Sequence, residues 1–402
     1  MGSKGNKSSV LRSCKSHQKG AFLTVILLLI FFVATACVGF LLMNSSPRVE
    51  SSVRFVSILH RHGERAPILT YPLDPYKDAA FWADGPEQLL QEGKVTTYDL
   101  GQFLRERYGG FLSSRYKAHE ILMRSSRIDR CLMSAELVLA GLYPPVGTQI
   151  WNKDLPWQPI PVQTAPDDAD DIIRVLKPCP LMSKEQEIVN DAIQKKLDEN
   201  KDLLTYISKS TGLQVETIQN IDDIHDNLLI SEQRGFKVPE WAREIYPKKL
   251  QELAAINYFQ LYDTPLLRKL RSGILINDIL DSMWKKINAS EKFERRMNIF
   301  SAHDTTLGRL WQAIDISEDL GLEKPIYGSA LIFELHETST SKYRVKILYK
   351  RGMLDRDMTV LHIKGCEGDP MAHQDGMCDL DTFSSALEPK AFSDYDKECK
   401  IP

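Results

Sequence analysis

The sequence predicts an α/β protein with a mainly helical insertion and an N-terminal membrane-spanning helix. Three observations support this class: short apolar runs that end in polar clusters, a long helical stretch without strand alternation, and one uncharged segment of 23 residues. A chain of 402 residues is long enough for one large domain with an insertion or for two domains. We expect one domain at 53–402 with a helical cap at roughly 165–295.

The N-terminal region predicts a membrane anchor. Residues 21–43 carry no charge and exceed the roughly 20 residues that a spanning helix needs. Five basic residues precede them, so the positive-inside rule leaves 1–20 as a cytosolic tail and places the remaining chain in the lumen or outside. Residues 44–52 then form a short stalk. The segment 21–43 is therefore interpreted as a signal-anchor that makes the membrane a partner of the chain.

A cleaved signal peptide is the alternative for the same segment, because Ala34-Thr35-Ala36 has the form of a cleavage site. Cleavage would give a secreted or lysosomal protein, and both interpretations place the chain in the secretory pathway. Asn288, in Asn288-Ala289-Ser290, is a candidate glycosylation site there.

Net charge and cysteine content indicate which partners and which cellular compartment suit the protein. The net charge is −3, and the chain beyond residue 43 carries −8, which argues against nucleic-acid binding by bulk electrostatics. Five cysteines follow the apolar segment, so an oxidising compartment predicts two disulfides and one free thiol. Cys131 lies on an apolar helical face and is the expected free thiol. Spacing alone leaves the pairing of the other four open.

The order of apolar patterns defines the expected elements. Strands are predicted at 53–59, 119–123, 297–301, 330–335 and 343–349, the last two as a hairpin. Helices are predicted at 89–108, 128–142 and 307–314, and the stretch 183–294 is helical in pattern.

Three of these strands end in polar clusters. The clusters are His60–Arg65, Arg124 and His303-Asp304. Ligands of open α/β sheets bind beyond the carboxyl ends of strands, so these side chains are expected to meet in one pocket. Arginine forks match phosphate oxygens, a histidine can act as a nucleophile, and a carboxylic acid can protonate a leaving alkoxide. The cluster therefore predicts a phosphoryl-transfer site.

At this point the residues carry a resemblance to a known family. Arg61-His62-Gly63-Glu64-Arg65-Ala66-Pro67 resembles the R-H-G-x-R-x-P signature of the histidine acid phosphatases, and His303-Asp304 resembles their H-D motif. The resemblance covers about Val53 to Cys399 and is greatest to animal prostatic and lysosomal acid phosphatases. It implies a doubly wound α/β domain with a helical cap, often dimeric, and no metal or other cofactor.

The resemblance also implies roles for individual residues. His62 attacks phosphorus and becomes phosphohistidine, and Asp304 donates a proton to the leaving alcohol. The remaining residues of the implied site hold the phosphoryl oxygens: Arg61, Arg65, Arg124 and His303. The implied disulfides join Cys179 with Cys399 and Cys366 with Cys378.

Three neighbouring residues are assigned structural roles. His60 is expected to pack in the core, and Asp129 with Arg130 to form a structural ion pair near the site.

The predicted activity is hydrolysis of phosphate monoesters at acidic pH through a phosphohistidine intermediate. Neighbouring arginines should lower the pKa of His62, so that it attacks in its neutral form under conditions that favour a protonated Asp304. Two alternatives stay open. One is a secretory-pathway phosphatase restricted to sugar phosphates, and the other is a non-catalytic membrane binding protein on the same fold.

Overall fold

The computed structural model describes residues 51–401 except 260–262, 289–292, 317–319, 321–323, 353–354, 370–371 and 373–374. The predicted tail, the anchor at 21–43 and nearly all of the stalk lie outside the described residues. Within the described part, no helix is long and apolar enough to cross a membrane.

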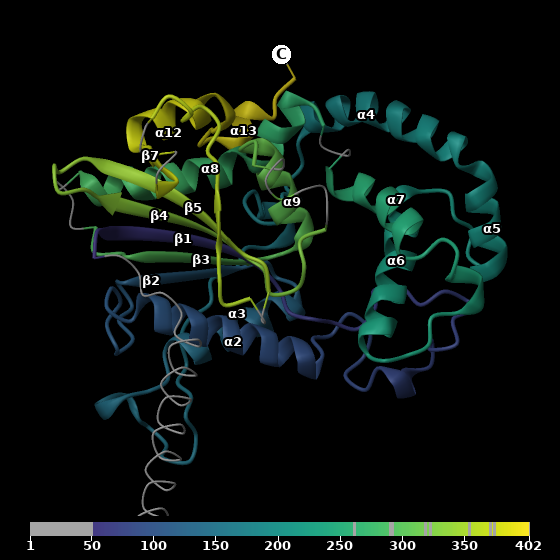
Figure 1. The fold of residues 1–402 in the computed structure, drawn as a ribbon, viewed down its shortest axis with the longest axis horizontal. Helices are drawn as coiled ribbons and strands as arrows, with labels where there is room; N and C mark the ends of the chain where they lie inside the picture. Colours follow the sequence, from purple (N-terminus) through teal and green to yellow (C-terminus); the bar gives the residue numbers. More distant parts are fainter. Residues whose placement is uncertain are drawn as a thin grey trace, which may run out of the picture. The chain divides into compact units, whose positions relative to one another are not determined.

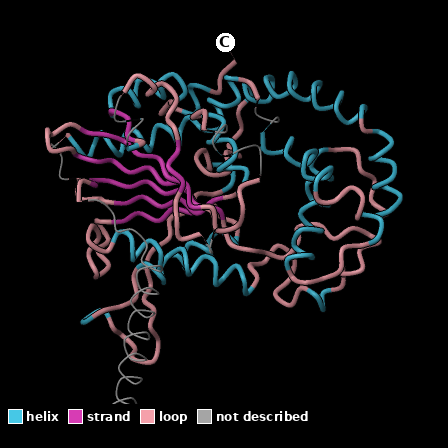
Figure 2. Tube along the Cα trace, viewed as in Figure 1, coloured by secondary structure: helices cyan, strands magenta, loops and turns pink. Residues whose placement is uncertain are grey.

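A mixed central sheet organises the residues that follow position 52 (Figures 1 and 2). Its strands are β1 (Val53–Arg61), β2 (Ile121–Ser125), β3 (Met297–Ala302), β4 (Ala330–Glu337), β5 (Tyr343–Lys350), β6 (Thr359–Leu361) and β7 (Met377–Asp379). The order is β2-β3-β1-β4-β5-β6, and β7 pairs with β5. The predicted α/β class with a central sheet, including the β4–β5 hairpin, is confirmed.

The register of the three parallel strands aligns their carboxyl ends. Arg61 of β1 lies opposite Ala302 of β3, and Ser125 of β2 lies opposite Ser301. β1 is buried along almost its whole length, as its nearly continuous apolar run predicts for a strand covered on both faces. Polar residues that follow these strands therefore leave the sheet at the same edge.

Helices cover both faces of the sheet. Helices α2 (Gln91–Tyr108) and α3 (Asp129–Leu142) pack on one face and share a core with the sheet residues Val56, Ile58 and Met123. The other face packs against α8 (Pro265–Ile287), α9 (Asp304–Ala313) and α12 (Leu380–Leu387), with Phe300 and Phe333 in that core.

A second hydrophobic core belongs to the inserted helices, at the right of Figure 1. These helices are α4 (Pro180–Glu199), α5 (Lys201–Thr211), α6 (Ile218–Gln233) and α7 (Lys248–Phe259), and their range contains no strand. Helix α8 connects the two regions, because Leu267 and Leu270 belong to this core and Ile276 and Ile279 to that of the sheet. The cap thus packs against the sheet region through α8, which contributes residues to both cores.

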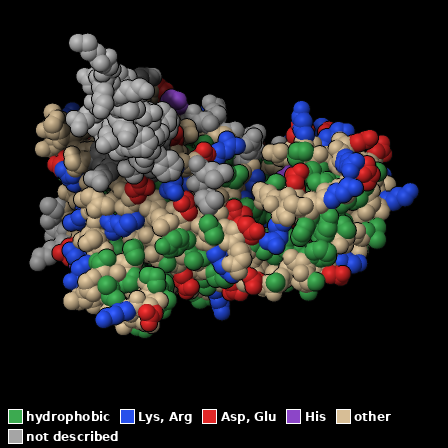
Figure 3. All heavy atoms as spheres, turned by 60° about the horizontal axis from the view of Figure 1, so that its bottom comes forward, with side chains coloured by type: hydrophobic (Ala, Val, Ile, Leu, Met, Phe, Trp, Pro, Cys, Tyr) green, Lys and Arg blue, Asp and Glu red, His purple; other side chains and the backbone are tan. Residues whose placement is uncertain are grey.

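Short elements complete the chain. Helix α13 spans Tyr395–Glu398, and 3₁₀ turns occur at Ala79–Phe81, Gly147–Gln149, Asp167–Ala169, Glu240–Ala242 and Glu388–Lys390. Asn288 is exposed at the end of α8, and the other two residues of its sequon lie outside the described part. On the face drawn in Figure 3, acidic and basic side chains are interspersed, as the small net charge predicts.

The cysteines pair as the resemblance implies. One disulfide joins Cys179 to Cys399 and the other joins Cys366 to Cys378. Cys131 is a buried free thiol, as its place on the apolar face of α3 predicts. The first disulfide ties the start of the cap to the C-terminal segment across a separation of 220 residues.

Candidate active site

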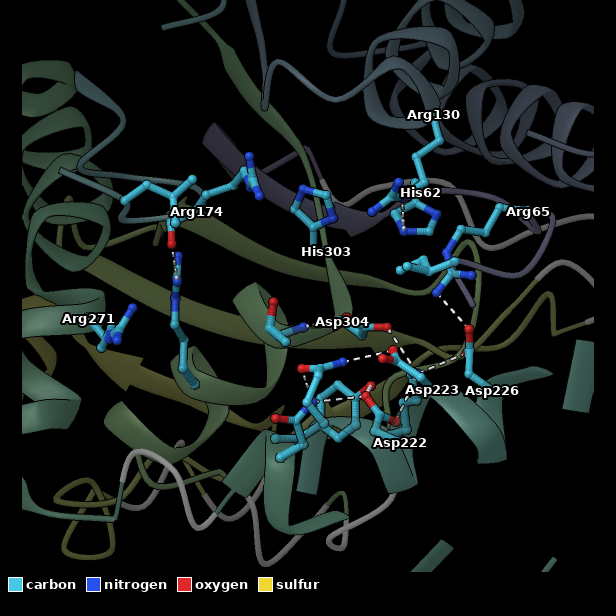
Figure 4. A pocket seen from close by; sticks show the side chains of 18 residues that line it. His62, Arg65, Arg130, Arg174, Asp222, Asp223, Asp226, Arg271, His303 and Asp304 are labelled. Carbon is cyan, nitrogen blue, oxygen red and sulfur yellow. Dashed lines mark hydrogen bonds and ion pairs between the residues drawn. The ribbon is translucent and has the colours of Figure 1, made fainter. Parts of the chain in front are cut away.

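The aligned strand ends open into a cavity of about 320 Å³. His62 follows β1 directly, and His303 follows β3 as the N-cap of α9. In Figure 4 the two imidazoles lie next to each other at one edge of the cavity, and three carboxylates of α6 lie opposite. The ring centroids of His62 and His303 are 5.6 Å apart. The predicted convergence of β1 and β3 is therefore present in the fold.

Two facing glycines allow the loop after β1 to reach this position. A Cβ on Gly63 would meet the backbone of Gly93 in α2 at 2.3 Å, and a Cβ on Gly93 would meet the backbone of Glu64 at 2.1 Å. Neither contact is compatible with a side chain, so the loop packs on the first turn of α2 only because both residues are glycine. This close packing fixes the backbone that carries His62.

A backbone hydrogen bond fixes the tautomer of His62. Its Nδ1 donates to the carbonyl of Gly63 at 2.8 Å, so Nε2 carries the lone pair. Nε2 accepts a hydrogen bond from Nε of Arg130 at 3.2 Å. The pKa of His62 is lowered well below its usual value. Burial is the largest cause, the charge of Arg130 is the next, and Arg61, His303 and Arg65 follow. The predicted effect of the arginines on this pKa is confirmed, and burial adds the largest part.

His303 is held by neutral neighbours. Its Nε2 lies 2.9 Å from Oγ of Ser126, the residue after β2, and 3.5 Å from Sγ of Cys131. Burial and then the charge of Arg130 lower the pKa of His303 to about 3. The pKa of the Cys131 thiol is raised to about 11, chiefly by burial, so the thiol packs against the imidazole without ionising.

Asp304 is held as a carboxylate by two cations. Its Oδ2 lies 2.6 Å from Nη2 of Arg61 and 3.5 Å from Nζ of Lys324. Although burial opposes ionisation, these charges hold the pKa of Asp304 far below its usual range. The expectation that acidic solution favours a protonated Asp304 is not met in this arrangement, because Arg61 and Lys324 stabilise the charged form.

The signature arginines, Arg61 and Arg65, each pair with a carboxylate; Arg65 lines the cavity beside His62, and Arg61 lines a neighbouring cavity. Arg61 is buried, donates from Nη1 to the carbonyl of Pro325 at 2.7 Å and lies 3.7 Å from the ring centroid of Tyr327. Arg65 forms an ion pair of 2.6 Å with Asp226 of α6. Both guanidinium groups are thus positioned by the fold and paired with acids that an arriving anion would compete against.

The structure does not bring Arg124 to the cavity. β2 runs two residues further than predicted, to Ser125, and Arg124 is still part of the strand. It pairs in register with Phe300, so its side chain points to the face covered by α8, where its charge acts on Asp278. Because successive side chains of a strand point to opposite faces of the sheet, the Arg124 side chain lies on the α8 face and does not reach the cavity at the strand end.

Arg130 lies where the third arginine was expected. It follows the first residue of α3, contacts Nε2 of His62 and pairs with Glu87 at 3.0 Å instead of forming the expected pair with Asp129. The signal that could have found it is the sequence Asp129-Arg130 at the start of a helix that follows a strand, since such a helix start faces the ligand side of the sheet.

Sequence reasoning missed the acidic part of the pocket. Asp222 and Asp226 are four residues apart on α6 and share one face of the helix, with Asp223 beside them (Figure 4). Lys324 completes the network from the segment before β4. The spacing Asp222-Asp223-Asp226 was visible, but nothing local says that this helical face turns toward the sheet. His60 is buried in β1, as expected.

Together these features define an α/β protein with a pocket that is lined by arginines and carboxylates and contains an unprotonated imidazole nitrogen. The family model of the histidine phosphatase superfamily (branch 2) matches residues 52–350. The chain belongs to this family.

Relatives and solved structures agree with that assignment. The chain is 35% identical to a lysosomal acid phosphatase of Xenopus laevis over 90% of this chain and 82% of that protein. It is 34% identical to a prostatic acid phosphatase of Bos taurus over 90% of this chain and 92% of that protein. A phytase from Citrobacter braakii shares the fold with a TM-score of 0.64 at 17% identity, over 87% of this chain and 100% of the phytase chain.

Proposed function

We propose that the protein is an acid phosphatase that hydrolyses phosphate monoesters through a phosphohistidine on His62. The observation that carries this proposal is the state of the His62 ring: Nδ1 donates to Gly63, and the lone pair of Nε2 is directed at Arg130 inside a cationic cavity. A neutral imidazole in this tautomer is a nucleophile that does not require deprotonation, even in acidic solution.

In this proposal the phosphoryl group is held by side chains from three elements. Arg61 ends β1 and Arg65 follows it, Arg130 lies in the first turn of α3, and the neutral His303 caps α9. Charge-assisted, bidentate contacts from arginines would neutralise the phosphoryl oxygens and stabilise the charge that develops in the transition state. Arg130 takes the role that was expected of Arg124, because Arg130 lines the cavity beside His62.

The chemistry then proceeds in two displacements. His62 Nε2 forms a bond to phosphorus while the P–O ester bond breaks, and Asp304 gives its proton to the departing alkoxide. Water next attacks phosphorus, the carboxylate of Asp304 takes a proton from that water, the N–P bond breaks, and inorganic phosphate leaves.

Asp304 must gain its proton on substrate binding. Asp304 pairs with Arg61, and a phosphate dianion would compete for that guanidinium group. Losing this cation raises the pKa of the carboxyl group, so a proton is taken up from the substrate monoanion or from solution.

Turnover of p-nitrophenyl phosphate at acidic pH tests the proposal. The wild-type domain should hydrolyse it, and His62→Ala should lose at least about 10³-fold in kcat, because removal of a covalent nucleophile abolishes most of the catalysis. The variant Arg124→Ala is the control and should retain activity. Near-full turnover by His62→Ala would refute the covalent mechanism.

A hydroxyl-rich leaving group is the second candidate for specificity, as in a sugar phosphate. The residues that line the cavity also include Gln219, Asp223 and Asn257, whose side chains can hydrogen-bond to hydroxyl groups. A panel of sugar phosphates and simple alkyl phosphates would test this, with kcat/KM expected to favour the sugar phosphates. Equal kcat/KM values would remove the preference.

We further propose that residues 53–402 form the catalytic domain and that 21–43 anchor it on the lumenal or outer side of a secretory-pathway membrane. Two disulfides and the exposed Asn288 support an oxidising, glycosylating compartment. Protease treatment of sealed microsomes should remove the N-terminal tail and spare the domain. Digestion of the domain in sealed vesicles would contradict this orientation.

A further inference from the structure

A lysine outside both signature motifs lies at the centre of the charge network. Lys324 precedes β4, and its side chain is only 11% exposed. Its Nζ lies 3.0 Å from Oδ1 of Asp226, 3.5 Å from Oδ1 of Asp222 and 3.5 Å from Oδ2 of Asp304. One ammonium group therefore contacts carboxylates of both α6 and α9.

The network connects the two signature arginines through this lysine. Arg61 pairs with Asp304, and Arg65 pairs with Asp226, each at 2.6 Å. Lys324 contacts both of these carboxylates. Asp304 and Asp226 thus each pair with one arginine, which a bound phosphate would attract, and both contact Lys324.

Lys324 is held in this position from several sides. Asn257 donates to Oδ2 of Asp222 at 2.9 Å, and the Tyr258 hydroxyl donates to the same oxygen, which leaves Oδ1 for the lysine. The ammonium also lies 4.8 Å from the centroid of the Tyr258 ring.

The charged and titratable groups around Lys324 come from every neighbouring element. They are Asp222, His225 and Asp226 on α6, Tyr258 on α7, Asp304 on α9, Arg61 at the end of β1, Arg65 after it, Tyr327 before β4, and Arg351 and Asp355 after β5.

Phosphate binding changes this balance unequally. When a phosphate dianion pairs with Arg61 and Arg65, these arginines no longer neutralise Asp304 and Asp226. The two carboxylates then compete for Lys324. Lys324 is 0.5 Å closer to Asp226 than to Asp304, and its anchor Asp222 belongs to the same helix as Asp226. Asp226 therefore keeps its cation, and Asp304 becomes the carboxylate that a proton neutralises.

We propose that Lys324 is a positioning residue that directs the proton to Asp304 by staying with Asp226 when substrate occupies the site. The proposal rests on the proposed phosphatase function and assigns the element that loads its acid. Lys324 acts through Asp304 and Asp226 and forms no bond to the reacting atoms.

The pH dependence of kcat with an alkyl phosphate tests this role. The basic limb of kcat reports loss of the Asp304 proton in the substrate complex. In Lys324→Met neither Asp226 nor Asp304 has a cation in the substrate complex, so the two carboxylates share the proton and the plateau value of kcat should fall about twofold or more. The limb itself should move to higher pH by about one unit, because the pair has lost an opposite charge. Lys324→Arg should keep the wild-type limb. The control Lys390→Met removes a lysine that pairs with Asp315 at 2.6 Å elsewhere, and should also keep it.

A second measurement uses the network without changing the lysine. Inorganic sulfate, which stays a dianion in acidic solution, is titrated calorimetrically into the protein at acidic pH, in buffers of different ionisation enthalpy. The wild type should take up protons on binding, Asp226→Asn should take up fewer because Lys324 is then free to pair with Asp304, and Asp304→Asn should take up none.

The outcomes separate this inference from the proposed function. Two outcomes would refute the role of Lys324 while leaving the phosphatase intact. One is a Lys324→Met variant with the wild-type kcat and basic limb, and the other is proton uptake that is kept in Asp304→Asn. A wild-type protein without turnover that depends on His62 would refute both.

Discussion

The loop after β1 and the α6 face of the cap build the same pocket in different ways. In the loop, Arg61, His62 and Arg65 come from one continuous string, and the short chain between them forces them together. On the cap side, Asp222 and Asp226 meet Lys324 only because two hydrophobic cores pack at the sheet edge. The comparison teaches that the proposed nucleophile and two of the proposed phosphate ligands are local in sequence. Arg130, His303 and the groups proposed to control protonation are brought together by packing.

The largest loss of activity is expected from substitution of Asp304, which contacts both Arg61 of the signature and Lys324 of the cap network. Asp304→Asn removes the proton donor and keeps the size of the side chain. For an alkyl phosphate kcat should fall about 10²–10⁴-fold, since general acid catalysis typically contributes this much. A nitrophenyl ester, whose leaving group needs little protonation, should lose far less. Equal losses for both esters would argue against proton donation by Asp304.

A pair of arginine substitutions tests whether position or motif identifies a phosphate ligand. Arg130→Ala should reduce kcat/KM for p-nitrophenyl phosphate about 10²-fold, the typical cost of losing one charge-stabilising donor. Arg124→Ala should change it by less than about threefold, because Arg124 faces α8 and is not part of the cavity. The reverse order of effects would restore the prediction made for Arg124.

Much of the fold could be predicted because its signals are local. The strand before His62, the apolar face of α3 and the β4–β5 hairpin each follow from the period of apolar residues. The sequence did not reveal that Arg130 lines the cavity and Arg124 does not, because a strand end is uncertain by a few residues and one step in a strand reverses the face of a side chain.

The cap network could not be derived from the sequence. Its contacts join α6 to the segment before β4, and a helical pattern does not reveal which partner covers its polar face.

The two disulfides offer a smaller test of the same contrast between local and long-range contacts. In the chain-entropy description, removing Cys179–Cys399 should cost about 5 kcal/mol of unfolding free energy, and removing Cys366–Cys378 about 3 kcal/mol, because the closed loops differ in length. Paired Cys→Ser variants compared by urea unfolding measure both. A greater loss from the short loop would show that local packing outweighs loop closure.

The smallest effect is expected at Cys131. The thiol is buried beside His303 with its pKa raised to about 11, so it contributes packing and no charge. Cys131→Ser should leave kcat/KM within about threefold and the pH profile unchanged, since the hydroxyl group is nearly isosteric. A shifted pH profile would indicate that the thiol controls the protonation of His303.

Trapping the phosphorylated enzyme tests the central claim most directly. The protein is mixed rapidly with a ³²P-labelled phosphate monoester, quenched in alkali, which preserves phosphohistidine, and mapped by peptide analysis. We predict one acid-labile label on the peptide that contains His62, present in Asp304→Asn and absent from His62→Ala. Label on another residue, or turnover with no label on His62 under conditions that trap the intermediate, would contradict the account.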